Sequence, residues 1–284
     1  MPELPEVETF KRYLDSTSLH QRITGIEVRD AYVLKRVSAR ELARRLKGRR
    51  FENSHRHGKH LFVRAGNELW LRLHFGMTGW LQYLKRDEET PTTARVLFSF
   101  ANNRRLAFDD QRKFGEVELI KDVDEFLQRR CIGPDALDVG LSEFKTIFRK
   151  HRGAVKAILL NQQLIAGIGN LYADEILFRA GMHPATAAAS LSDKDLQAVV
   201  SCNAPCAGKS NCVENRFQSF AEIVAASASW KTRQMSALRS RVEISNDRRP
   251  HFMVLRALPE AKRIPKLRPA TYTAELSTIS AQHF

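Results

Sequence analysis

The first nine residues, MPELPEVET, place a proline directly after Met1 and a glutamate directly after that proline. If the initiator methionine is removed, Pro2 carries a free secondary amine. A terminal α-amine has a pKa of roughly 7.7–8.0, so a useful fraction is unprotonated at neutral pH. Such an amine can attack an electrophilic carbon and form an iminium, which is covalent catalysis. Glu3 would then be within reach as a proton donor or acceptor.

The same stretch also has a purely structural interpretation. Residues 5–16, PEVETFKRYLDS, have helical periodicity, with Val7, Phe10 and Leu14 on one face. A proline suits the first turn of a helix, and Pro2 can simply fix the helix entry. These residues alone leave both interpretations open.

The composition indicates a polyanionic partner. The 284 residues carry a formal net charge of +14, and the isoelectric point is near 9.9. Nucleic acid is the simplest such partner, although charge alone does not separate DNA from RNA or anionic lipid. No apolar run has the length of a membrane span, and the first twenty residues lack the apolar core of a signal peptide. We therefore expect a cytoplasmic protein with no membrane part.

Two kinds of pattern divide the chain. Short segments rich in β-branched and aromatic residues predict strands at 23–30, 59–66, 68–77, 94–100, 104–110 and 116–120. Segments with helical periodicity follow at 122–130, 141–150, 154–162, 170–181 and 191–200. The sequence therefore predicts an α+β protein: a helix, then a β-sandwich or barrel, then a helical domain.

Residues 202–284 have a different character, with little periodicity, basic runs and a Ser/Thr-rich tail. We expect this region to be poorly ordered. Its three cysteines, Cys202, Cys206 and Cys212, follow a C-x3-C-x5-C spacing with no second pair, which is a poor zinc pattern. Together with Cys131 they do not indicate a disulfide framework in a cytosolic protein. We therefore predict no metal site in the chain as written.

Three stretches together resemble one protein family. They are MPELPEVET at the start, QRKFGEVEL at 111–119 and LLNQQLIAGIGNLYADEILFRAGMHP at 159–184. Residues 1 to about 201 resemble formamidopyrimidine-DNA glycosylase. The related endonuclease VIII branch typically opens with PEGPE, so PELPEVET favours the formamidopyrimidine branch. The resemblance implies an N-terminal β-sandwich domain at residues 1–130 and a helix–two-turn–helix domain at residues 131–201.

The resemblance also implies a bacterial base-excision repair enzyme. Such an enzyme extrudes an oxidised purine, 8-oxoguanine or a formamidopyrimidine, from double-stranded DNA. It implies that the Pro2 amine attacks C1′ of the sugar, that Glu3 gives acid–base help, and that β,δ-elimination then nicks the strand. Lys59, in RHGKHL, matches the proton donor of β-elimination; without the family it would read as a solvated strand lysine. A monomer is expected.

Four further residues match the family's DNA contacts in the β domain. His74, in LHFGM, matches a phosphate-contacting histidine, whereas a lone histidine after an apolar strand is more often structural. Met77, Arg112 and Phe114 match the side chains that fill the void left by the extruded nucleotide and contact the orphaned base. The alternative for Met77 and Phe114 is ordinary core packing.

In the helical domain, Lys156 and Asn170 match phosphate contacts, and Asn170 is also a natural helix N-cap. The resemblance implies that Gly167 and Gly169 let backbone amides approach a phosphate at the start of a helix. His151 stands where relatives often carry a basic DNA-contacting residue, so it is a weaker expected contact.

The resemblance implies one more feature that this chain lacks. Relatives bind one structural zinc in a C-terminal C-x2-C-x16-C-x2-C finger, but no cysteine follows Cys212 here. Two segments can be back-translated into codons and read again one nucleotide later. In that frame MSALR (235–239) can encode Cys-Pro-Arg-Cys-Gly, and VLRALPE (254–260) can encode Phe-Cys-Ala-Leu-Cys-Gln. The two cysteine pairs then have the family spacing. This pattern predicts a single-nucleotide frame slip near Ser201 and Cys202, which makes residues 202–284 an aberrant remnant. The absence of the finger cysteines keeps a second hypothesis open, namely that the protein binds damaged DNA but is catalytically impaired.

Overall fold

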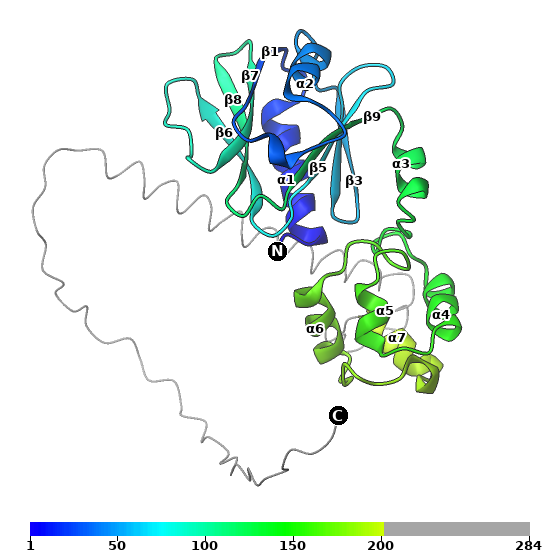
Figure 1. The fold of residues 1–284 in the computed structure, drawn as a ribbon. Helices are drawn as coiled ribbons and strands as arrows, with labels where there is room; N and C mark the ends of the chain where they lie inside the picture. The colour runs from blue at the N-terminus through cyan, green and yellow to red at the C-terminus, as the bar shows by residue number, and fades with distance from the viewer. Residues whose placement is uncertain (202–284) are drawn as a thin grey trace, which may run out of the picture. The chain divides into compact units, whose positions relative to one another are not determined.

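The computed structural model describes residues 1–201, and every expectation about residues 202–284 lies outside this range (Figure 1). The chain begins with α1 (Leu4–Ser18), as predicted. A capping box stabilises the start of α1: the Glu3 side chain accepts from Glu6 N–H, and the Glu6 side chain accepts from Glu3 N–H. Val7 and Leu14 are fully buried on the face that the periodicity indicated.

Two sheets follow and form the predicted sandwich (Figure 1). All neighbouring strands in these sheets are antiparallel except β2 and β9. The four-stranded sheet has the order β1 (Ile23–Val28), β7 (Ala94–Phe100), β8 (Arg104–Asp110), β6 (Gly79–Lys85). The five-stranded sheet has the order β2 (Leu34–Lys35), β9 (Glu116–Ile120), β5 (Trp70–His74), β4 (His60–Arg64), β3 (Asn53–His57).

The core of the β domain lies between the sheets and includes one face of α1. Alternating side chains of β5 and β8 enter it, among them Leu71, Leu73 and Phe108. α1 contacts both β3 and β6, so it fills the side of the sandwich where these two edge strands lie. This packing fixes the start of the chain relative to the β3–β4 hairpin.

Several elements of the β domain were not predicted, among them β2, β3, β6 and α2 (Ala39–Leu46). The segment Asn53–His57 contains no apolar residue, and its strand β3 is held by backbone pairing with β4 at the sheet edge. Residues of β6 and the short helix α2 were also missed. α2 begins at Ser38, whose hydroxyl accepts from Glu41 N–H. The sequence patterns of these elements are weak by themselves, because each element is stabilised by strands that are its neighbours only in the folded protein.

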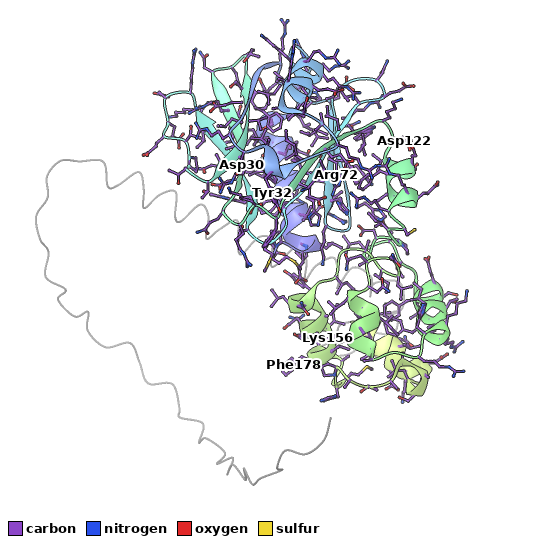
Figure 2. All side chains as sticks on the ribbon, in the orientation of Figure 1. Asp30, Tyr32, Arg72, Asp122, Lys156 and Phe178 are labelled. Carbon is purple, nitrogen blue, oxygen red and sulfur yellow. The ribbon has the colours of Figure 1, made fainter. Side chains whose placement is uncertain are left out.

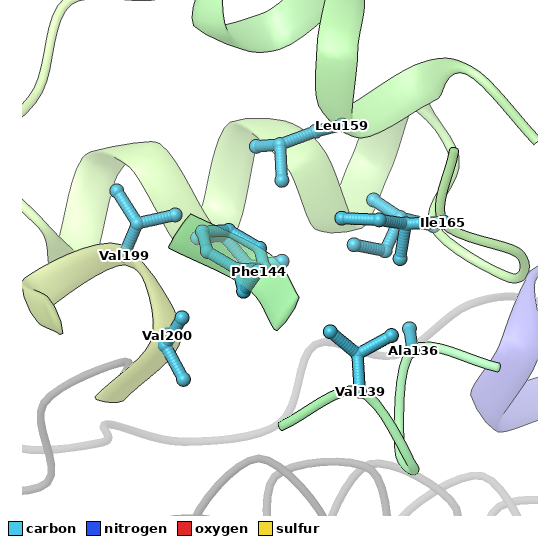
Figure 3. Close-up of a pocket in the computed structure, with 9 residues that line it drawn as sticks. Ala136, Val139, Phe144, Leu159, Ile165, Val199 and Val200 are labelled. Atoms are coloured by element: carbon cyan, nitrogen blue, oxygen red, sulfur yellow. The ribbon is translucent and has the colours of Figure 1, made fainter. Parts of the chain in front are cut away.

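The helical part contains α3 (Val123–Arg129), α4 (Leu141–Lys150), α5 (Val155–Leu160), α6 (Asn170–Arg179) and α7 (Asp193–Ser201). These helices confirm the predicted segments. Their core includes Phe148, Leu159 and Leu177. Figure 3 shows a small pocket within this core, lined only by apolar side chains such as Phe144 and Ile165. It offers no group for chemistry. No helix within residues 1–201 combines the length and apolarity needed to cross a membrane.

Candidate active site and DNA interface

The Glu3 side chain joins the start of the chain to the first turn of α6. Its buried carboxylate accepts three backbone N–H bonds, from Gly169 at 2.8 Å, Leu171 at 3.0 Å and Tyr172 at 3.2 Å. Amide donors at a helix N-terminus stabilise the charged form of a carboxylate. The Glu3 side chain is therefore fixed by backbone donors directly after Pro2.

Two glycines make this approach possible. Gly167 has φ +113°, and a Cβ there would lie 2.6 Å from Leu4 Cδ1. A Cβ on Gly169 would lie 2.3 Å from the Glu3 carboxyl carbon. Leu4 N–H also donates to the Gly167 carbonyl at 3.1 Å. The glycines thus make room for the beginning of the chain.

This arrangement bears on two expectations about the same turn. The amides of Gly167 and Gly169 donate to Gln162 Oε1 and to Glu3, and the expected approach of backbone amides to a phosphate at this helix start stays a prediction. The N-cap of α6 is Gly169, so the predicted capping role of Asn170 is wrong. Asn170 is instead the exposed first residue of the helix, where its amide faces solvent.

Pro2 is half-buried and stands in extended backbone before α1. Met1 precedes it and is 54% exposed. Its nitrogen is therefore part of a peptide bond until Met1 is removed, and an amide nitrogen is not a nucleophile. The hydrogen bonds of Glu3 and Leu4 fix the two residues that follow, so a free Pro2 amine would be held in a defined place.

Lys59 lies in the turn between β3 and β4 rather than in a strand. Burial lowers the pKa of its ammonium, and the nearby Glu3 carboxylate partly opposes this shift. The preceding Gly58 has φ +55°, and a Cβ there would lie 2.8 Å from Ala166 Cβ. The lysine is thus half-buried beside Glu3, and the solvated-strand alternative fails.

One buried carboxylate fastens this turn to the segment that begins the helical part. Asp135 accepts from Gly58 N–H at 2.6 Å and pairs with the Arg56 guanidinium. His57 Nε2 lies 2.8 Å from the Gly133 carbonyl. Residues 133–135 therefore hold the hairpin that presents Lys59.

His74 ends β5 and is held as a neutral imidazole. Burial, reinforced by the Arg72 guanidinium, lowers its pKa to about 4, whereas Glu116 acts in the opposite direction. Gly76 N–H donates to His74 Nδ1 at 3.2 Å, so the neutral ring carries its proton on Nε2. The pKa of His74 is also lowered by Lys59, which places the two side chains near each other.

Met77 and Phe114 are not core residues, because they are 41% and 52% exposed. They project from two neighbouring turns, residues 76–78 and 111–115. The Arg112 guanidinium lies over the Phe114 ring, 5.1 Å from its centroid. A Cβ on Gly76 would lie 2.4 Å from the Phe114 carbonyl carbon, so the two turns pack backbone to backbone. The structure thus brings together three side chains expected to enter DNA.

A second buried carboxylate ties these two turns together. Asp110 Oδ1 accepts from the Thr78 hydroxyl, and Oδ2 accepts from Gly115 N–H, both at 2.6 Å. The same hydroxyl accepts from Arg112 N–H at 3.0 Å. Asp110 is completely buried, so its carboxylate depends on these donors.

Lys156, labelled in Figure 2, and His151 lie in the helical part. Lys156 Nζ on α5 is 2.7 Å from Asp174 Oδ1, so a phosphate would have to compete with that carboxylate. His151 Nδ1 lies 2.7 Å from the Ile147 carbonyl and must carry the proton, because a carbonyl only accepts. A neutral His151 therefore has only an acceptor, Nε2, to offer.

Sequence reasoning missed the positioning residues Asp110, Thr78 and Asp135. Each is a small polar residue at the edge of a loop, in FDDQRKFG, FGMTG and IGPDALD. The available signal was an acidic side chain within a few residues of a motif glycine, as with Asp110, five residues before Gly115. Within residues 1–201 no three His, Cys, Asp or Glu side chains could together hold a metal ion.

The fold is thus a β-sandwich domain joined to a helical domain, with the Glu3 side chain bound to the first turn of α6. Comparisons with known proteins identify the family that has these two domains. Residues 1–117 match the formamidopyrimidine-DNA glycosylase N-terminal domain, and residues 132–204 match the formamidopyrimidine-DNA glycosylase H2TH domain. The protein belongs to the formamidopyrimidine-DNA glycosylase family.

Individual relatives support the same conclusion. The formamidopyrimidine-DNA glycosylase of Moorella thermoacetica is 38% identical over 200 residues, which cover 69% of this chain and 73% of the relative. That of Acidothermus cellulolyticus is 41% identical over 202 residues, covering 68% and 70%. A solved complex of Lactococcus lactis Fpg with abasic-site DNA is 31% identical, with a TM-score of 0.66 over 69% of this chain and 73% of that chain.

Proposed function

We propose that this protein, once Met1 is removed, excises oxidised purines from double-stranded DNA and nicks the strand at the resulting abasic site. The observation that carries this proposal is the approach of Lys59 to Glu3, the residue that follows Pro2. Three amides donate to the Glu3 side chain, and burial lowers the pKa of Lys59. A buried lysine with a lowered pKa beside a carboxylate favours catalysis over a purely structural role.

Each residue has a role that its environment suits. The Pro2 amine attacks C1′ and displaces the base, which leaves with its bonding electrons. The amine then loses its proton, the C1′–O4′ bond breaks with a proton delivered to O4′, and a positively charged iminium remains. The Glu3 side chain, held in place by backbone N–H groups, gives acid–base help in these proton transfers. Lys59 provides the proton for elimination of the phosphates; its lowered pKa makes this donation easier.

The DNA would be gripped beside this centre. The neutral His74 offers a hydrogen bond from Nε2 rather than a charge, so it contributes no counter-ion release. Met77, Arg112 and Phe114 would occupy the space left by the extruded nucleotide. Lys156 and Asn170 would add phosphate contacts from α5 and the start of α6.

Reductive trapping tests the proposal. With borohydride, the full chain should become covalently attached to duplex DNA that contains 8-oxoguanine or an abasic site. A variant with one extra residue before Pro2, and the Pro2→Gly variant, should trap poorly yet bind the same DNA. Intact mass reports whether Met1 is present. Wild-type trapping by the variants would show that a lysine is the nucleophile.

A second candidate function rests on where the family resemblance stops. The two family matches end by residue 204, and the relatives extend beyond the matched part. The four finger cysteines of the family have no counterparts after Cys212, so the residues present do not fit a zinc finger. Without that element the chain could bind damaged DNA yet excise slowly. Stable binding with no trapping would support this alternative.

A further inference from the structure

One surface of the β domain is strongly basic and has no role in the proposed reaction. Residues 35–50, KRVSARELARRLKGRR, contain eight Lys and Arg and one acidic residue, Glu41. α2 forms the middle of this segment. Its apolar side chains, Leu42 and Leu46, are fully buried, so the helix turns its charged side to solvent.

The exposed basic side chains form a continuous set. Arg40, Arg44 and Lys47 are spaced i, i+4, i+7 and so lie on one face of α2. Arg50 follows, and its backbone pairs with that of Arg22. All five side chains are exposed. We call this set, Arg22, Arg40, Arg44, Lys47 and Arg50, the basic face.

The charges of the basic face are almost uncompensated. Within residues 1–201, Arg22, Arg40, Lys47 and Arg50 make no ion pair, and Arg44 comes only within 3.9 Å of Glu41. Exposed arginines elsewhere are better paired, as Arg29 is with Glu27 at 2.8 Å. Uncompensated like charges at i, i+4 spacing destabilise a helix. The spacing of these like charges therefore works against the helix itself.

Helix capping explains only part of the pattern. Cations in the last turn favour a helix because they face the negative end of its dipole, and Arg44 satisfies this rule. Arg40 instead lies in the first turn, at the positive end, where a cation is unfavourable. A binding role accounts for Arg40, whereas helix stability does not.

The basic face lies far from Pro2. His20 N–H donates to the Phe51 carbonyl just after α1 ends, and the Arg22–Arg50 pair is adjacent. Pro2 precedes the other end of α1, whose 15 residues span about 22 Å. Figure 1 shows α2 and the N-terminus at opposite ends of α1. A phosphate held at the catalytic end is thus out of reach of these side chains.

We propose that the basic face binds a second segment of double-stranded DNA through its phosphates, while the catalytic end holds the lesion strand. This proposal rests on the proposed function only for the DNA segment held at the catalytic end. Guanidinium groups bind phosphate bidentately, and four of the five residues are arginines. A membrane surface is a poorer partner, because α2 exposes no leucine to enter lipid. Two duplex sites would let the protein pass between DNA segments without full release.

The test counts duplexes on the full chain. Native mass spectrometry and sedimentation are performed with an undamaged duplex of about one helical turn, about 10 bp. The variant Arg40→Gln/Arg44→Gln/Lys47→Gln is compared with the control Arg12→Gln/Arg29→Gln/Arg86→Gln. All six residues are exposed, and each variant loses three positive charges. Both keep every other basic residue of the chain, so a difference between them is attributable to α2.

We expect two duplexes bound by the wild type and the control and one bound by the α2 variant. The α2 variant should also show a salt dependence weaker by about 2.7 in log–log slope, since three phosphate contacts are lost. A single duplex on the wild type, or equal loss in both variants, would overturn the proposal. So would wild-type binding to phosphatidylserine vesicles without a second duplex. Undamaged DNA needs no chemistry, so failed borohydride trapping would refute the proposed function and leave this result standing.

Discussion

At the scale of single residues, the site depends on side chains held by backbone hydrogen bonds. The Glu3 side chain accepts from three amides of the α6 turn, in addition to the Glu6 N–H of the capping box, and each amide is a donor that cannot accept. His74 is a neutral donor because Gly76 N–H occupies its Nδ1. In both cases backbone geometry, rather than the side chain alone, sets the chemistry.

Replacing Glu3 by Gln should impair base excision strongly. The amide –NH2 would face backbone N–H donors, and one lost acceptor in a buried site costs about 1–3 kcal/mol. Loss of the acid–base group should slow excision of 8-oxoguanine by roughly 10²–10⁴-fold. Nicking at a preformed abasic site should fall less, because that substrate has already lost its base.

Single-turnover assays on the two substrates measure the difference. Glu143→Gln, an exposed carboxylate in the first turn of α4, is the matched control and should leave both rates unchanged. Equal losses on the two substrates in the Glu3→Gln protein would contradict a role of Glu3 in base departure.

The lowered pKa of His74 predicts how stability depends on pH. Its pKa is about 4 in the folded chain and 6.5 in an unfolded one, so between these values the unfolded state binds more protons. The free energy of unfolding should therefore fall as pH drops from 6.5 towards 4. Urea unfolding at pH 7 and pH 5 measures this fall, and His74→Gln should reduce it. An unchanged fall in that variant would rule out His74 as a source.

At the scale of elements, two turns act as one unit. The β5–β6 turn carries Met77, and the β8–β9 turn carries Arg112 and Phe114. They are joined by the Thr78 hydroxyl, which donates to Asp110 and accepts from Arg112 N–H. Because the three exposed side chains share this support, we expect them to be positioned before DNA arrives.

Thr78→Val tests that support, since valine has the shape of threonine without the hydroxyl. Buried Asp110 then loses a donor, and trapping on duplex 8-oxoguanine should fall about tenfold, which corresponds to about 1.4 kcal/mol. Trapping on a single-stranded abasic oligonucleotide should be unaffected, since no base pair is opened. Thr78→Ser keeps the hydroxyl and should behave as wild type. A Val variant that loses both activities equally would point to a role in folding alone.

At the scale of the whole molecule, the chain has the two family domains and a C-terminal sequence that does not fit the third element. A frame slip near Ser201 would explain why the family matches end by residue 204, and back-translation of residues 235–239 and 254–260 can place cysteines at zinc spacing in the next frame. We propose that such a slip, natural or introduced in sequencing, produced residues 202–284.

Two measurements address this proposal. The purified 284-residue chain should contain no stoichiometric zinc, and its DNA binding should be weak and insensitive to chelators, because the metal that would organise a finger lacks ligands. Resequencing the gene across the Ser201 codon should reveal the slip. An unbroken frame, or one zinc per chain, would refute it. A corrected frame should restore both zinc and tight binding.

The sequence by itself determined the family, the order of elements and most of the residues at the site. Pro2, Glu3, Lys59 and His74 lie in short motifs that can be recognised from the sequence alone. The elements α4, β7, β8 and β9 end where hydrophobic periodicity ends. Periodicity records burial against a single face, which a local pattern can encode.

Only the tertiary structure decided what those residues touch. It showed that Gly167 and Gly169 make room for the start of the chain, and that Gly169 rather than Asn170 is the N-cap of α6. It also revealed Asp110 and Asp135, whose partners are distant in sequence, such as Gly58 for Asp135. Hydrogen bonds between distant segments produce no periodic pattern in the sequence, because each depends on where two turns come together in the fold.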